Sequence, residues 1–220
     1  MSDYFSEAKK RIEEQIPEFE SQDFKKMRDK IKKELQHKEA EISLLRRRLK
    51  ILILGDWKTK EDKECLLEIK NCLLANGLYA ETIDSYYDTR TKSGLSQRNI
   101  FEICCINHQL IVFIDGEGPG TVTGQNYLTD NYIFQGKVIF FIKESKFNSL
   151  NGNPSEYISM FPTIISYKAE ELKNAVLVYA RLRIYRLAEI ILRQQQSGKG
   201  TSNPDYKPWK ERLGKKGNRP

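Results

Sequence analysis

Histidine, tryptophan and methionine are scarce in this chain, and no apolar run approaches the length of a membrane span. Only His37 and His108 could add imidazole to the four cysteines, none of which forms a C-x-x-C pair. The sequence therefore predicts neither a metal site nor a cofactor, and reduced, buried thiols explain the cysteines better. Since Met1 is not followed by an apolar stretch, we expect a cytoplasmic protein that does not contact a membrane.

The excess of positive charge lies outside the centre of the chain. Residues 1–20 carry a net charge of −3, residues 21–50 carry +6 and residues 196–220 carry +5, which leaves −1 for residues 51–195. Basic arms are compatible with nucleic acid as a partner, because phosphate contacts need only clustered Lys and Arg. Solvated helix faces and a solubilising tail give the same pattern, so both interpretations stay open.

One long helix is predicted over residues 21–49, with apolar side chains at most positions of a seven-residue repeat. The repeat favours a helical hairpin or a self-associating coiled coil, and hence a homo-oligomer. Packing of the helix onto the rest of its own chain explains the repeat equally well. The repeat positions are Phe24, Arg28, Ile31, Leu35, Lys38, Ile42, Leu45 and Leu49. Pro17 separates this helix from an amphipathic first segment.

From residue 50 onward, short apolar segments alternate with amphipathic ones. This alternation predicts an α/β fold with a five-stranded parallel, flavodoxin-like (Rossmann-like) sheet in the order 2-1-3-4-5. The predicted strands are 50–55, 78–84, 110–115, 137–143 and 161–167, and the predicted helices are about 60–76, 96–108 and 168–195. We thus expect three parts, which are a helical or coiled-coil arm (1–49), an α/β domain (50–195) and a flexible basic tail (196–220).

The third predicted strand ends at Asp115 in a glycine-rich loop that opens a helix. In open α/β sheets the ligand crevice lies at the carboxyl ends of the strands, here at the switch point between strands 1 and 3. We therefore expect a nucleotide-like ligand at this loop, whereas a tight turn without a ligand is the alternative. Neither G-x-G-x-x-G nor G-x-x-x-x-G-K-[ST] occurs. The predicted ligand-binding residues are Gly55, Asp56, Trp57, Asp84, Arg90, Arg98, Gly116, Gly118, Gly120, Thr121, Gln125 and Asn126.

Residue chemistry indicates a role for several of these side chains. Trp57 offers a stacking face for a nucleobase, or covers the top of the core. Arg98, in a helix capped by Ser96, can hold a phosphate with a bidentate fork, or remain solvated. Thr121 is expected to cap the helix that follows the loop, and Asp115 is expected to accept backbone N–H groups of the turn.

The last predicted helix mixes aromatic and basic side chains. Tyr179 and Tyr185 alternate with Arg181, Arg183 and Arg186. We expect the tyrosines at or beside the stripe that faces the core and the arginines on the outer face. A packed helix with a basic outer face is therefore preferred to a nucleic-acid-binding stripe.

The segment Gly118-Pro119-Gly120-Thr121, after a strand and an acidic loop, resembles the nucleoside 2-deoxyribosyltransferase family and its N-glycosidase relatives, which are distantly similar to TIR domains. The resemblance covers about residues 50–145 and implies an α/β domain that binds a nucleoside or nucleotide. In the family motif D-x-G-T-x-x-E the glutamate attacks the sugar and the aspartate assists. The G-T of the motif corresponds to Gly120-Thr121, which places Gly118 and Gly124 at the two carboxylate positions.

Both motif carboxylates are therefore missing. Glycine can neither stabilise an oxocarbenium-like centre nor protonate a leaving base. The resemblance thus implies a nucleotide or nucleotide-sugar binding module that is catalytically silent or altered. A nucleic-acid-associated protein that binds phosphates through its basic arms is the second hypothesis. The third is an N-glycosidase that uses Glu117 as a substitute carboxylate, with Asp115 beside it.

Overall fold

The computed structural model describes residues 11, 22–90, 94–149 and 161–196. The predicted first segment, the loop at 150–160 and the basic tail lie outside these residues, except for Arg11 and Gln196. The chain divides into two compact units, residues 1–43 and residues 44–220. No helix in the described ranges has both the length and the apolar character that crossing a membrane requires.

Helix α2 (Gln22–Arg48) is the long helix that the seven-residue repeat predicts. Three of its apolar side chains are well exposed, with relative exposures of 62% for Met27, 45% for Ile31 and 56% for Leu35. Ile31 and Leu35 occupy positions of the seven-residue repeat that a coiled coil would bury. Association through this helix stays a prediction.

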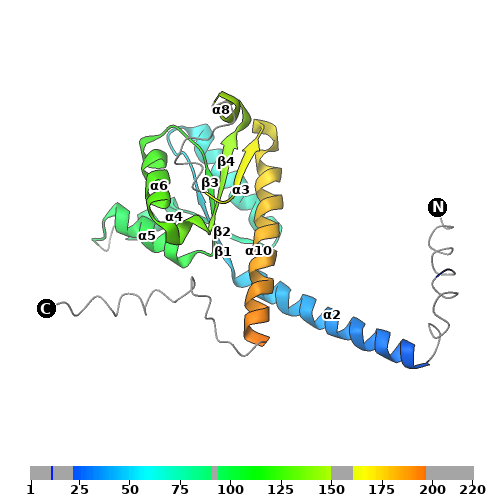
Figure 1. The fold of residues 1–220 in the computed structure, drawn as a ribbon. Helices are drawn as coiled ribbons and strands as arrows, with labels where there is room; N and C mark the ends of the chain where they lie inside the picture. Colours follow the sequence, from blue (N-terminus) through cyan, green and yellow to red (C-terminus); the bar gives the residue numbers. More distant parts are fainter. Residues whose placement is uncertain (1–10, 12–21, 91–93, 150–160, 197–220) are drawn as a thin grey trace. The chain divides into compact units, whose positions relative to one another are not determined.

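A five-stranded parallel sheet in the order β2-β1-β3-β4-β5 forms the centre of the second unit, which confirms the predicted topology (Figure 1). Its central strands are apolar at nearly every position because helices cover both faces of the sheet. The strands are β1 (Lys50–Leu54), β2 (Tyr79–Thr82), β3 (Leu110–Ile114), β4 (Val138–Lys143) and β5 (Ile164–Tyr167).

Helices flank the sheet on both sides (Figure 1). Helices α3 (Lys60–Ala75) and α10 (Leu172–Gln196) cover one face, whereas α4 (Asp84–Arg90), α5 (Gln97–Asn107) and α6 (Pro119–Asp130) cover the other. The shorter elements are α7 (Tyr132–Gln135), α8 (Glu144–Ser149) and the 3-10 helix η2 (Ala169–Glu171). The polar stretch after β2 therefore contains a helix, α4, that the sequence did not predict.

The helix starts follow local capping chemistry. The Ser96 hydroxyl accepts a hydrogen bond from the backbone N–H of Asn99, which confirms Ser96 as the cap of α5. Helix α6 begins at Pro119 with Gly118 as its N-cap, so the expectation that Thr121 caps this helix is wrong. Proline presets the backbone angle of a first helical residue and starts the helix earlier. Thr121 instead lies in the first turn and is buried.

Lys137 closes the opposite end of α5. Its ammonium group donates to the backbone carbonyls of Cys105, Ile106 and His108, over 3.3, 3.2 and 3.0 Å. Helix α5 has no basic residue in its own last turn, so Lys137 supplies the positive charge that the helix dipole favours there. Burial lowers the pKa of Lys137.

His108 follows α5 and is the centre of a buried polar cluster. Its Nδ1 lies 2.6 Å from the carbonyl oxygen of Cys104, and its Nε2 lies 3.2 Å from Oε2 of Glu81. The hydroxyls of Tyr86 and Tyr79 also donate to Glu81. Burial by itself would raise the pKa of Glu81, but the hydrogen bonds to its carboxylate have the larger effect, so the pKa of Glu81 is lowered. Burial also lowers the pKa of His108. The cluster fixes α4 through Tyr86.

We expect the free energy of unfolding to fall as the pH drops below about 6.5, the ordinary pKa of histidine. Because the folded state lowers the pKa of His108, the unfolded chain binds more protons in this range, and acid favours unfolding. Urea titrations between pH 7 and pH 5 measure the slope, which His108→Gln should flatten. His37→Gln, on exposed α2, is the matched control. Equal slopes in the wild type and His108→Gln would contradict the assignment.

Candidate functional site

A pocket with a volume of about 360 Å³ opens at the carboxyl ends of β1 and β3, where the order of the strands reverses. We call it the switch-point pocket. Six of the predicted ligand-binding residues line it, namely Gly55, Asp56, Trp57, Gly118, Gly120 and Thr121. The topology therefore brings the end of β1 and the glycine loop after β3 together, as the sequence predicts.

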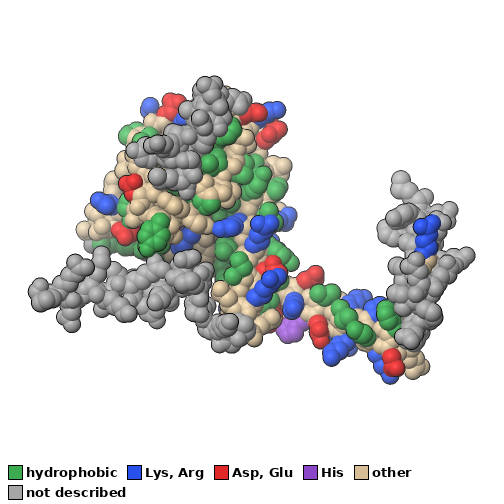
Figure 2. Space-filling view, viewed as in Figure 1, with side chains coloured by type: hydrophobic (Ala, Val, Ile, Leu, Met, Phe, Trp, Pro, Cys, Tyr) green, Lys and Arg blue, Asp and Glu red, His purple; other side chains and the backbone are tan. Residues whose placement is uncertain are grey.

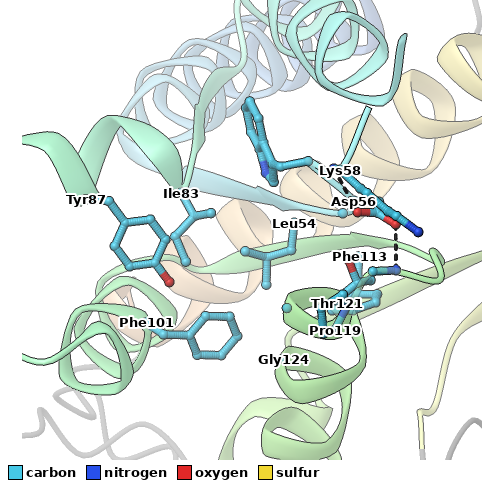
Figure 3. A pocket seen from close by; sticks show the side chains of 14 residues that line it. Leu54, Asp56, Lys58, Ile83, Tyr87, Phe101, Phe113, Pro119, Thr121 and Gly124 are labelled. Carbon is cyan, nitrogen blue, oxygen red and sulfur yellow. Dashed lines mark hydrogen bonds between the residues drawn. The ribbon is translucent and has the colours of Figure 1, made fainter. Parts of the chain in front are cut away.

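Aromatic and aliphatic side chains form most of this pocket. Figure 3 shows Tyr87 and Phe101 on one side, Asp56 and Thr121 on the other, and Leu54 between them. Trp57 also lines the pocket, and Lys63 places its Nζ 5.6 Å from the centre of the indole ring. Such a wall suits a flat, largely apolar ring with a few polar edges.

A second, larger hollow of about 620 Å³ adjoins the first, and we call it the side pocket. The residues common to both are Tyr87, Phe101, Pro119, Gly120 and Gly124. Arg98 and Asn126, both predicted, line the side pocket, and the Arg98 guanidinium lies 5.6 Å from the ring centre of Tyr127. Burial and the neighbouring Glu102 raise the pKa of Tyr127 to about 12, so its phenol stays protonated. Together the two hollows form one groove between α5 and α6.

The carboxyl group of Asp56, which follows β1, packs against the glycine loop after β3. Its Oδ2 accepts a hydrogen bond of 2.6 Å from the backbone N–H of Gly118. Its Oδ1 accepts a hydrogen bond of 3.0 Å from the backbone N–H of Lys58. A Cβ on Gly118 would lie 2.3 Å from Asp56 Oδ1, and one on Gly116 would lie 2.7 Å from Asp56 Cβ. The missing side chains of these glycines therefore leave space for the side chain of Asp56. The sequence predicts a ligand in this space instead.

A side chain at either motif position would meet a neighbouring side chain. The carboxyl group of Asp56 fills the region into which a side chain at Gly118 would project. At Gly124, a Cβ would lie 3.3 Å from the ring of Phe101. Asp56 thus closes the first of the two motif positions, whereas Phe101 narrows the second.

Asp115, Gly116 and Glu117 line a third pocket, of about 420 Å³, and do not line the switch-point pocket. The carboxylate of Asp115 forms a 2.6 Å ion pair with Lys146 of α8. Among the described residues, the N–H of Gly118 donates to Asp56 and not, as the sequence had suggested for a turn N–H, to Asp115. Glu117 is exposed.

Three buried polar atoms near the ends of β1 and β2 have no hydrogen-bond partner among the described residues. They are Nε1 of Trp57, Oγ1 of Thr82 and Oδ1 of Asp84. Buried polar atoms are normally paired, so an unpaired group next to a pocket points to a bound water or ligand. Of the three, Trp57 lines the switch-point pocket, and Asp84 directly follows Ile83, which also lines it.

The remaining predicted site residues lie elsewhere. Gln125 is half-buried and lines none of the three pockets, and the side chain of Arg90 is outside the described part. Sequence reasoning missed Phe101, which closes the groove on the α5 side. The sequence does contain a signal for Phe101, because it follows Arg98, a predicted ligand-binding residue, by three positions. Residues three apart lie on the same side of a helix.

No family model matches the chain, and no curated protein matches it in sequence. Function must therefore be inferred from the groove itself. In the described ranges, no three or more His, Cys, Asp or Glu side chains are grouped so that they could hold a metal ion.

Proposed function

We propose that the groove between α5 and α6 binds a nucleoside or nucleotide-like small molecule. The supporting observation is the aromatic wall at the switch point, where Trp57, Tyr87 and Phe101 line one pocket. Aromatic side chains stack on nucleobases, and pockets for small molecules are mainly apolar with a few placed polar groups. The unpaired indole N–H of Trp57 provides one such polar group.

Asp56 determines how such a ligand lies. A phosphate at the start of α6 would meet a carboxylate that already accepts the N–H of Gly118, and like charges at that distance repel. Arg98 supplies a guanidinium in the side pocket, at the other part of the groove. We infer that the base enters the switch-point pocket and that any phosphate lies towards Arg98.

Loss of catalysis is the simpler account of the missing carboxylates. Asp56 fills the position where the resemblance to the nucleoside 2-deoxyribosyltransferases would place the aspartate, and Phe101 narrows the position of the glutamate. Glu117, the substitute carboxylate of the N-glycosidase hypothesis, lines a different pocket. We therefore place binding without base release ahead of an altered enzyme.

A thermal-shift screen of the full chain against nucleosides, nucleotides and nucleotide sugars tests the proposal. A ligand at a hundredfold excess over its dissociation constant stabilises the folded state by about 2.7 kcal/mol. For a chain of this length that is a rise in Tm of about 5–10 °C. Trp57→Leu should abolish the shift, whereas Trp209→Leu, which removes the other tryptophan, should preserve it.

Two further variants separate the parts of the proposal. Arg98→Gln should reduce the shift with a nucleotide and leave the shift with its nucleoside unchanged. Chromatography of each positive mixture should show intact ligand. Free base that disappears in Glu117→Gln would establish the N-glycosidase instead, and no shift with any compound would contradict a binding site.

A further inference from the structure

The outer face of α10 carries a group of basic and aromatic side chains that the groove does not use. Tyr185 lies directly after buried Ile184 and is 41% exposed. Arg181 and Arg186 are exposed next to it, one turn before and one residue after. Figure 2 shows several Lys and Arg side chains around the middle of α10, among apolar side chains.

The last turn of α2 extends this group within the same compact unit. The guanidinium carbon of Arg46 lies 6.0 Å from the ring centre of Tyr185, within the range of a cation–π contact. Arg47 and Arg48 follow it and are exposed. We call the set of Arg46, Arg47, Arg48, Arg181, Tyr185 and Arg186 the arginine face.

Four arginines of this face are exposed, whereas the guanidinium group of Arg46 lies over the ring of Tyr185. Among the described residues, none of its five arginines forms an ion pair, and Nε of Arg46 is buried without a hydrogen-bond partner. By contrast, Lys173 and Arg193 of the same helix pair with Glu68 and Glu189. The positive charge of the arginine face is therefore not compensated locally.

We propose that the arginine face binds single-stranded nucleic acid. Guanidinium groups bind phosphate with paired hydrogen bonds, and an exposed tyrosine between them offers a face on which a base stacks. Tyr185 lies one turn after Arg181 and directly before Arg186, so one stacking face is flanked by two phosphate-binding groups. This site differs from the groove and from the basic tail, which lies outside the described residues.

Fluorescence anisotropy with a labelled 15-nucleotide RNA and DNA strand tests the proposal on the full chain. Arg181→Gln/Arg186→Gln should weaken binding at least tenfold at about 50 mM salt. It should also make the slope of log K against log salt shallower by about 1.4, because each phosphate contact contributes about 0.7 for a single strand. The control Lys168→Gln/Lys173→Gln removes the same charge just before η2 and in the first turn of α10, and it should change affinity less than threefold.

Tyr185→Leu distinguishes nucleic acid from an acidic protein segment as the partner. It should weaken binding of the strand about tenfold without changing the salt slope, and poly-glutamate of equal charge should compete poorly. Equal losses in the arginine and lysine variants, or no effect of either, would overturn the proposal and leave residues 1–43 and the basic tail as the source of any binding. Equal competition by poly-glutamate would also overturn it.

Discussion

Gly118→Ala is expected to lower the free energy of unfolding by about 3 kcal/mol. The backbone angles of Gly118 (φ −66°, ψ 144°) are open to any residue, so the cost is not one of backbone strain. It arises because the new Cβ would lie 2.3 Å from Oδ1 of Asp56, and overpacking of this kind costs about 1–3 kcal/mol. Displacement of Asp56 would also weaken its bond to the Gly118 N–H.

Gly120→Ala is the matched control, two residues further along the same loop. A Cβ there meets nothing within 4 Å, and Gly120 is already helical, so alanine should be neutral or stabilising by up to about 1 kcal/mol. Urea titrations of both variants make the comparison. A loss at Gly118 no greater than that at Gly120 would show that Asp56 does not fill the loop.

A double-mutant cycle with Asp56→Ala localises the effect. If the clash with the carboxylate causes the loss, Gly118→Ala should cost less than about 1 kcal/mol once that carboxylate is absent. The cycle should then show a coupling energy of about 2 kcal/mol, since contacting residues are not additive. An additive cycle would assign the cost to another neighbour.

Lys137→Met is expected to lower the free energy of unfolding by about 2 kcal/mol. Methionine retains the apolar stem but removes the ammonium group that donates to three carbonyls at the end of α5. An unsatisfied buried acceptor costs about 1–3 kcal/mol, and the favourable charge at the helix end is lost as well. Because α5 carries Arg98 and Phe101, ligand binding in the groove should weaken in the same variant.

Lys60→Met is the control for Lys137→Met. Lys60 is an exposed lysine whose contact is an ion pair with Glu64 one turn later, and such pairs contribute about 0.5 kcal/mol or less. Chemical denaturation of the two variants gives the comparison. Equal, small losses would mean that water replaces Lys137 at the end of α5.

The fold was predictable because its signals are local and repeated. Each central strand is a short apolar run, and the helices between them show one apolar face, so the crossover rules leave few arrangements. Gly77, with φ of 72°, ends α3 as its sequence position indicates. Boundaries were less predictable, as Pro119 shows, because capping depends on one or two residues.

The lining of the site was predictable only in part. Residues at strand ends, such as Trp57 and Gly118, follow from topology alone. The position of the Asp56 carboxyl group against the glycine loop does not follow from topology, because it depends on side-chain packing between segments 62 residues apart. For the same reason Asp115, the nearer carboxylate in sequence, was assigned contacts that Asp56 makes, whereas its own partner is Lys146.

Trp57 permits the most direct test of the proposed site, because the chain has only two tryptophans. In the Trp209→Phe variant, fluorescence excited at the red edge of tryptophan absorption, where the eleven tyrosines do not absorb, reports Trp57 alone. Titration with the nucleosides and nucleotides that raise the Tm should quench this fluorescence saturably, since a stacked base lies against the indole. The dissociation constant should match that from the thermal shift. Unchanged Trp57 fluorescence at ligand concentrations that stabilise the protein would place the ligand elsewhere and contradict the switch-point pocket as the binding site.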